Sequence, residues 1–147
     1  MPLEGAYEPS PSAWVAEQVR DFEASGGREH NTLRGVPIVV LTTRGRRSGK
    51  LRKAALMRVE HDGRYVVVAS MGGAPTHPVW YLNLLDDPEV MVQDGDRVID
   101  ARARTATADE RAEWWPRATA VWPDYDAYQE RTDREIPVVI LEPTTST

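Results

Sequence analysis

The chain has 147 residues, a formal net charge of −5 and no cysteine, and 41% of its residues are hydrophobic. This composition predicts one soluble globular domain, and the lack of thiols excludes disulfides, thiolate metal sites and a cysteine nucleophile. Only three histidines occur, far apart, and no apolar run is long enough to span a bilayer or to form a signal peptide. We therefore expect a cytoplasmic protein without a metal site.

The N-terminal region, residues 1–32, is predicted to hold a loose tail and one amphipathic helix. Ser10 and Pro11 form a helix start, apolar residues recur at helical spacing after them, and Gly26–Gly27 ends the helix. The acidic residues on this helix make a poor membrane face. We therefore expect the helix to pack on its own domain, with a peripheral membrane contact as the alternative.

Residues 33–143 are predicted to form the main domain, which consists largely of strands joined by tight turns. Residues 37–43 are apolar and β-branched, which indicates a buried strand. Asp-Gly turns within residues 61–63 and 94–96 predict two hairpins. The hairpin strands cover residues 51–60 with 64–69, and 89–93 with 97–104. With a last strand near residues 136–141, about six strands predict a mainly β protein with peripheral helices, built as an antiparallel barrel, and residues 144–147 form a polar tail.

Three short helices are predicted at the edges of this barrel. The glycine-rich segment Ser70–Asn83 leads into the first of them, which must end before the next proline. Thr107 and Glu110 have the spacing of a capping box and start the second helix, which Pro116 must kink or split. The third covers residues 124–131.

The basic residues are concentrated in one part of the chain. From His30 to Val59 there are eight basic residues and no Asp or Glu, whereas the rest of the chain has ten basic and all 23 acidic residues. An acidic protein with such a stretch is expected to bind an anion there. A solvated basic loop without a ligand is the alternative.

The centre of this stretch, Thr42–Lys53, has a composition that suits a phosphate. Its glycines allow backbone amides to approach a ligand, and its arginines supply paired donors. It is not a P-loop, because Gly45 and Gly49 are only four residues apart and Leu51 follows Lys50. Aromatic residues are not interleaved with these bases, and the acidic remainder would repel a polyanion, so we do not expect nucleic acid as a partner.

The glycine-rich segment Ala69–Tyr81 is a second candidate binding element. Gly72 and Gly73 leave main-chain groups free to contact the edge of a flat heterocycle, with Trp80 packed nearby. An ordinary connection from a strand to a helix, with the tryptophan in the core, explains the same pattern. His77 directly precedes a proline, so we interpret it as a helix-entry residue rather than a general base.

A pair of tyrosines is the third candidate feature. Tyr125 and Tyr128 are three residues apart and share one face of the predicted helix, where their phenols can donate hydrogen bonds to a reduced substrate. Two half-buried core tyrosines would give the same pattern. No Ser-His-Asp arrangement or close pair of acids indicates a hydrolase.

Three ordered motifs together resemble the deazaflavin-dependent nitroreductase family over residues 33–143. They are TTRGRRSGKLRK, ASMGGAPTHPVWYLN and DYDAYQERTDREIPVVILEP. Members of that family have a split β-barrel of the flavin-reductase, FMN-binding type and bind coenzyme F420, an 8-hydroxy-5-deazaflavin with a phosphodiester and an oligoglutamate tail. The resemblance implies that F420 is the cofactor, and its anionic tail would explain the basic stretch.

The resemblance also implies which residues contact the cofactor. These are Arg46, Arg47, Ser48, Lys50, Arg52, Lys53, Ser70, Met71, Gly72, Gly73, Ala74 and Trp80. Within this set, three arginines match phosphate-contacting bases, the two lysines match the tail, residues 70–74 match the loop along the deazaflavin, and Trp80 matches the aromatic residue beside it. Some relatives have lysine where this chain has Met71, so a charged contact is missing here.

The expected reaction follows from the resemblance to this family. Reduced F420 delivers a hydride, so we expect a reductase whose acceptor is a small electron-poor molecule such as a quinone or a nitroaromatic compound. Tyr125, Tyr128 and Ser70 would line the acceptor side as the catalytic residues. A non-catalytic carrier of a deazaflavin, another flavin or haem, and an FMN-dependent oxidoreductase remain as alternatives. The sequence makes no prediction about the oligomeric state.

Overall fold

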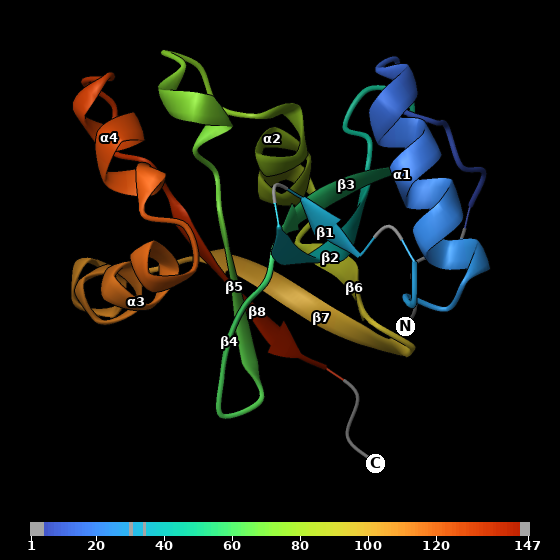
Figure 1. The fold of residues 1–147 in the computed structure, drawn as a ribbon. Coiled ribbons are helices and arrows are strands. Elements are labelled where there is room, and N and C mark those ends of the chain that lie inside the picture. Colours follow the sequence, from blue (N-terminus) through green and yellow to red (C-terminus); the bar gives the residue numbers. More distant parts are fainter. Residues whose placement is uncertain (1–4, 30, 34, 145–147) are drawn as a thin grey trace.

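The computed structural model describes residues 5–29, 31–33 and 35–144. Within these residues, an eight-stranded sheet curls into a split barrel with helices around it (Figure 1). The strands are β1 (Thr32–Leu33), β2 (Val36–Arg44), β3 (Leu51–Met57), β4 (Val59–His61), β5 (Arg64–Val68), β6 (Glu89–Asp94), β7 (Arg97–Thr105) and β8 (Val138–Pro143). They pair antiparallel in the order β3-β2-β6-β7-β8-β5-β4, with β1 on the first residues of β2. The prediction of an antiparallel barrel is confirmed.

Arg58 separates β3 from β4, so the prediction of one strand over residues 51–60 is wrong at this position. On one side of Arg58, β3 pairs with β2, and on the other side β4 pairs with β5. These pairs lie at the two ends of the sheet. The chain must therefore change its pairing partner where the barrel curls round, and a break in the strand allows this. The Arg58 N–H donates to the Pro37 carbonyl at 2.9 Å.

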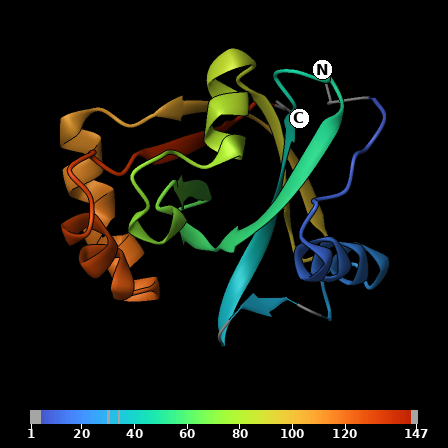
Figure 2. The ribbon, with the colours of Figure 1, turned by 90° about the horizontal axis from the view of Figure 1, so that it is seen from above.

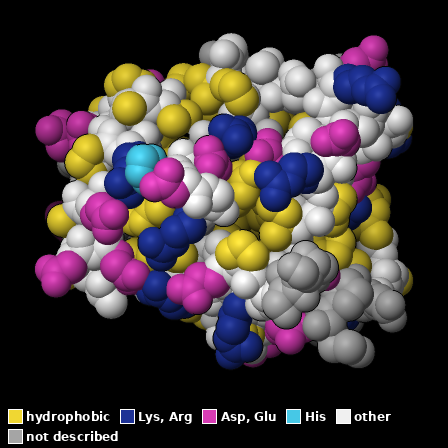
Figure 3. Space-filling model, turned by 90° about the horizontal axis from the view of Figure 1, so that it is seen from below, with side chains coloured by type: hydrophobic (Ala, Val, Ile, Leu, Met, Phe, Trp, Pro, Cys, Tyr) yellow, Lys and Arg dark blue, Asp and Glu magenta, His cyan; other side chains and the backbone are white. Residues whose placement is uncertain are grey.

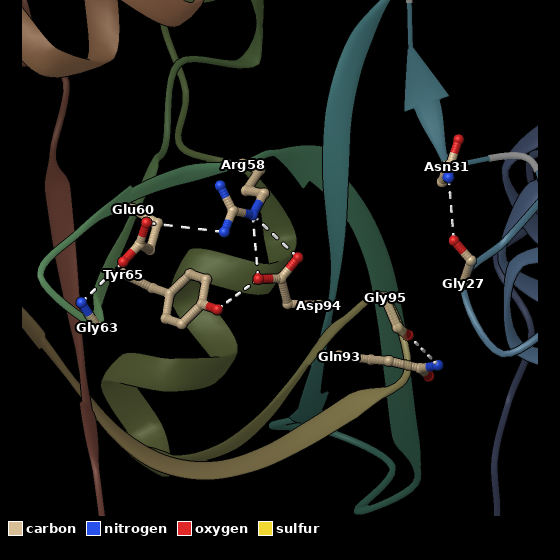
Figure 4. Close-up of polar contacts among 9 residues, drawn as sticks. All are labelled: Gly27, Asn31, Arg58, Glu60, Gly63, Tyr65, Gln93, Asp94 and Gly95. Atoms are coloured by element: carbon tan, nitrogen blue, oxygen red, sulfur yellow. Dashed lines mark hydrogen bonds and ion pairs between the residues drawn. The ribbon is translucent and has the colours of Figure 1, made fainter.

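A polar network anchors the Arg58 side chain at this break (Figure 4). Its Nε donates to both carboxylate oxygens of Asp94 at 3.0 Å, and its Nη2 lies 3.7 Å from Glu60 Oε1. The Tyr65 hydroxyl donates to the same Asp94 carboxylate. Burial and Asp94 raise the pKa of Tyr65 to about 12, so this phenol keeps its proton. The network ties β4 and β5 to the end of β6.

Both predicted hairpins are confirmed, although the turn of the second is Gly95-Asp96, because Asp94 still pairs with Arg97. In the β4–β5 turn, Asp62 and Gly63 have φ values of 55° and 79°, and in the β6–β7 turn Gly95 has a φ of 62°. Left-handed backbone at the centre of a two-residue turn matches the right-handed twist of the strands it joins. Asp and Gly adopt this conformation at low cost, which explains why the sequence pattern was informative.

The predicted helices form with small shifts of their ends. They are α1 (Ala13–Ala24), the 3₁₀ turn η1 (Met71–Gly73), α2 (Val79–Asp86), α3 (Ala108–Val121) and α4 (Asp124–Glu130). Of the two predicted effects of Pro116, a kink or a split, the split does not occur, because α3 runs through this residue. Trp114 and Ala118, on either side of the proline, are buried in the same cluster, and this packing holds the helix together.

The helices cover opposite sides of the barrel, with α3 and α4 on one side and α1 on the other (Figure 2). Val19 and Phe22 of α1 are buried against Ile38 and Val40 of β2. The expected packing of the N-terminal helix on its own domain is thus confirmed. Among the described residues, no helix has the length and apolar character needed to cross a membrane.

The start of α3 makes the stability of the protein depend on pH. Thr107 and Glu110 form the predicted capping box, and Arg104 donates two hydrogen bonds of 2.7 Å to the Glu110 carboxylate. Chiefly because of Arg104, and also Thr107, the pKa of Glu110 falls from 4.5 to about 2. A carboxylate whose pKa is lower in the folded state stabilises the fold above its unfolded pKa and loses this contribution as the pH falls.

We therefore expect the free energy of unfolding to decrease as the pH is lowered from about 5 towards 2. A Glu110→Gln variant should be less stable than the wild type at pH 7 and should depend less on pH in this range. Urea unfolding at several pH values measures both effects. Parallel curves for the two proteins would contradict the role of Glu110.

Candidate active site

A cavity of about 750 Å³ lies beside β3 and is the candidate active site. Residues 52–57 of β3 border it, together with the start of the loop after β5, α2, α4 and the N-terminal segment up to α1. Apolar side chains such as Trp14, Val15 and Met57 form much of its wall. A cavity of this size with a few polar groups suits a small organic ligand.

The six bases of Arg44–Lys53 fall into two groups in the structure. Three of them are paired with acids. Arg44 Nε lies 3.6 Å from Asp87 Oδ2, and Arg52 Nη1 lies 3.5 Å from Glu8 Oε1. Lys53 forms an ion pair with Glu23. The other three, on the β2–β3 turn, are exposed and have no ion-pair partner in the described part of the chain: Arg46, Arg47 and Lys50. Ser48, in the same turn, accepts a hydrogen bond from the Lys50 N–H at 3.1 Å.

On the lower face of the barrel, as far as the described residues show, Lys and Arg side chains alternate with Asp and Glu side chains (Figure 3). A polyanion finds no extended basic surface on this side. The unpaired turn is therefore the better candidate for binding an anion.

Asn83 joins the basic turn to the cavity, and the sequence analysis did not single it out. Its side chain is 2% exposed and borders the cavity. The side-chain Oδ1 accepts from the Arg46 N–H at 3.2 Å, and Nδ2 donates to Thr43 Oγ1 at 3.2 Å. A single amide within the apolar helix VWYLNLLD is the signal that could have indicated it, because a buried amide needs partners.

The glycine-rich loop, residues 69–74, borders the cavity and packs against α4. Ser70 and Met71 border the cavity, and Met71 adopts a left-handed backbone with a φ of 45°. Gly73 has a φ of 82°, and a Cβ atom at this position would lie 2.6 Å from the Tyr128 carbonyl oxygen. Only glycine allows the loop to approach α4 this closely.

The tyrosines of α4 form the part of the wall next to this loop. Both Tyr125 and Tyr128 border the cavity, and their ring centroids are 6.1 Å apart. Burial, and then the neighbouring Tyr128, raise the pKa of Tyr125 above its usual value, so its phenol remains protonated. The Trp122 indole N–H donates to the Tyr128 hydroxyl oxygen at 3.2 Å, which leaves the phenolic proton of Tyr128 available.

Arg134 contacts the glycine-rich loop from the segment between α4 and β8, and no sequence pattern indicated it. Its guanidinium donates to three loop carbonyls, those of Ala69, Ser70 and Ala74, at 2.8–3.1 Å. It also lies 3.1 Å from His77 Nδ1. Burial and Arg134 lower the pKa of His77, so its neutral ring can accept this bond. His77 directly precedes the Pro78 N-cap of α2, as expected of a helix-entry residue.

The structure brings together part of the expected site. The cavity is bordered by Arg52, Lys53, Ser70, Met71, Trp80, Tyr125 and Tyr128. Arg46, Arg47, Ser48 and Lys50 lie on the adjoining turn, which Asn83 ties to the cavity wall. Gly72 belongs to the same 3₁₀ turn, and Gly73 and Ala74, in the same loop, do not border the cavity.

Solved structures of similar proteins support both the fold and the class of enzyme. An F420-H2 dependent reductase, FDR-A, is 52% identical and covers 72% of this chain and 94% of its own, with a TM-score of 0.69. A structure described as a domain-swapped dimer is 47% identical and covers 90% of this chain and 100% of its own, with a TM-score of 0.71. The haem storage protein HutZ of Vibrio cholerae, at 14% identity, covers 90% of this chain and 92% of its own and shares only the fold, with a TM-score of 0.56.

Sequence comparisons identify the family. Residues 14–143 match the model of the family described as F420H(2)-dependent quinone reductase. A Mycobacterium tuberculosis protein that carries the same family name is 41% identical over 108 residues, which are 74% of this chain and 91% of that protein. A second Mycobacterium tuberculosis protein, an F420H(2)-dependent quinone reductase, is 30% identical over 82% of this chain and 83% of its own. The chain therefore belongs to the F420H(2)-dependent quinone reductase family, and is an oxidoreductase that uses F420.

Proposed function

We propose that this protein transfers a hydride from reduced F420 to an apolar quinone-like acceptor that sits beside Tyr125 and Tyr128. One observation carries the proposal: a single cavity joins the glycine-rich loop, Trp80 and both phenols, and the unpaired basic turn adjoins it. The apolar wall favours an acceptor without charge. Nitroaromatic compounds, which are also flat and electron-poor, are expected as adventitious acceptors.

The residues around the cavity fit F420 in charge and in shape. Arg46, Arg47 and Lys50 are exposed and have no ion-pair partner among the described residues, so they can donate to a phosphodiester and to carboxylates. A guanidinium group can contact either of these anions with two parallel hydrogen bonds. Ser70, Met71 and Trp80 would then hold the flat ring system against the wall. When bound, reduced F420 supplies the hydride, and the protein has to orient it and exclude water.

The tyrosines would act on the acceptor. Negative charge develops on a quinone oxygen when it receives a hydride, and a phenol O–H aimed at this oxygen stabilises the charge. Tyr128 is the better candidate donor, because its oxygen already accepts the indole N–H of Trp122 and its proton remains free. Ser70, which is 8% exposed, would help to orient the same oxygen.

A Trp122→Phe variant tests this arrangement at low structural cost. It removes the indole N–H but keeps an aromatic ring, so we expect kcat to fall by about three- to tenfold with unchanged affinity for F420. Tyr128→Phe should have a similar or larger effect. In the double variant the effects should be less than additive, because both changes affect one hydrogen-bonded pair. Additive effects would show that the two side chains act separately.

Binding and turnover measured on the same preparation test the proposed function. Fluorescence titrations with F420, FMN and haem should show tight binding of F420 alone. Stopped-flow mixing of the enzyme and reduced F420 with menadione should show oxidation of the cofactor. Binding of F420 without turnover of any quinone would indicate a carrier, and tight binding of FMN in place of F420 would indicate an FMN-dependent enzyme.

A further inference from the structure

We infer that Arg134 is a positioning residue for the reaction: its guanidinium fixes the loop of residues 69–74 so that the amide N–H groups of Ser70 and Met71 are presented to the bound ring system. The inference rests on the proposed function. It concerns a residue outside the cavity wall, in the segment between α4 and β8.

The contacts of Arg134 are directed almost entirely at this one loop. Nε donates to the Ala74 carbonyl at 2.8 Å, Nη2 to the Ser70 carbonyl at 2.8 Å, and Nη1 to the Ala69 carbonyl at 3.1 Å. Within the described residues, no carboxylate lies at ion-pair distance from this guanidinium. A half-buried cation without a counterion depends on these carbonyl dipoles, so it holds their orientation firmly.

The orientation of the carbonyls determines where the next N–H groups point. In a trans peptide the C=O of one residue and the N–H of the following residue point in opposite directions. All described peptide bonds are trans, so the N–H groups of Ser70 and Met71 point away from Arg134. Within the described residues neither N–H has a hydrogen-bond acceptor, and both residues border the cavity.

The positive charge of Arg134 also acts on the bound ligand, through the peptide groups whose carbonyls it contacts. A cation bound to a carbonyl oxygen polarises the peptide group and makes its N–H a stronger donor. Two such peptides, those joining Ala69 to Ser70 and Ser70 to Met71, connect the guanidinium to residues that border the cavity. They would stabilise negative charge on a carbonyl of the bound ring.

Arg134 also fixes the distance between the loop and the tyrosines. The loop also contacts α4 at Gly73, where a Cβ atom would lie 2.6 Å from the Tyr128 carbonyl oxygen. The loop is therefore held both by the guanidinium and by the helix that carries Tyr125 and Tyr128. Loss of Arg134 should affect both the binding of F420 and the approach of the acceptor.

Three variants test the inference, with Arg111→Gln as the matched control. Arg111 also donates to a backbone carbonyl, that of Ile136 at 3.1 Å, but it does not border the cavity or contact the loop. We expect Arg134→Gln to weaken F420 binding at least about tenfold more than Arg111→Gln, and to lower kcat at saturating F420. Arg134→Lys keeps the charge and should recover part of both losses.

A readout without cofactor distinguishes the two proposals. In the free protein, NMR titration of His77, with its signal assigned from a His77→Asn variant, should show a higher pKa in Arg134→Gln but not in Arg134→Lys or Arg111→Gln. Equal F420 affinity in Arg134→Gln and Arg111→Gln overturns the inference and leaves the proposed function intact. If the wild type does not bind F420, the proposed function fails. If, in addition, the pKa of His77 is the same in Arg134→Gln as in the wild type, the inference fails as well.

Discussion

Gly73→Ala should lose about 2–4 kcal/mol of folding free energy and reduce kcat/KM with F420 by about 100-fold or more. Gly73 has a φ of 82°, which is unfavourable for any residue with a Cβ atom. The added Cβ would also lie 2.6 Å from the Tyr128 carbonyl oxygen and 3.1 Å from the Arg131 Cβ. Since these atoms belong to α4 and to the residue that follows it, the loop and the tyrosines must move apart.

The β4–β5 turn offers a matched control for this prediction. Gly63 has a φ of 79°, almost the same as that of Gly73, but a Cβ atom added there would meet nothing within 4 Å beyond its chain neighbours. Gly63→Ala should therefore cost only the backbone strain, about 1 kcal/mol, and leave F420 binding unchanged. Chemical denaturation and F420 titration of both variants distinguish the cost of backbone strain, which both share, from the displacement of the loop from α4, which only Gly73→Ala should cause. Equal behaviour of the two variants would show that the contact between the loop and α4 is unimportant.

Replacing both Arg46 and Arg47 with alanine should weaken F420 binding by about 2–3 kcal/mol at low ionic strength, close to 100-fold. These side chains are exposed and have no ion-pair partner among the described residues, so a bound anion gains their full attraction. The loss should become smaller as salt is added, because exposed charges are screened. Titrations at two salt concentrations measure both the loss and its salt dependence.

The matched control for the double variant is Arg64→Ala combined with Arg97→Ala. These arginines begin β5 and β7, do not border the cavity, and their removal changes the net charge by the same amount. The affinity of this control variant for F420 should change little. Arg52→Ala should have a smaller effect than either change in the basic turn, since this side chain already pairs with Glu8. If the control weakens binding as much as the double variant, overall charge rather than the turn attracts the cofactor.

The sequence predicted the elements whose causes are local. The Asp62-Gly63 turn and the capping box of Thr107 and Glu110 depend on residues only a few positions apart, and both formed as expected. The break at Arg58 could not be predicted in this way, because it depends on β4 pairing with β5 rather than with β2. Local patterns carry no information about such a change of partner.

The site shows the same division between local and tertiary causes. Helical spacing left open whether Tyr125 and Tyr128 line the cavity, and the resemblance to a known family implied that they do; their shared helical face and the basic turn were predictable from the sequence itself. Asn83 and Arg134 were not, because each acts through backbone groups of a segment distant in sequence. The count of charges along the chain also missed Glu8 and Glu23, which approach the basic strand only in the folded protein.

Those two acids have a consequence for how the protein meets its ligand. Glu8 and Glu23 pair with Arg52 and Lys53, two cations that also border the cavity. An anion that extends onto β3 has to displace these internal counterions. Docking of the N-terminal segment and affinity for such an anion are therefore thermodynamically linked: docking weakens anion binding by the same factor by which a bound anion weakens docking.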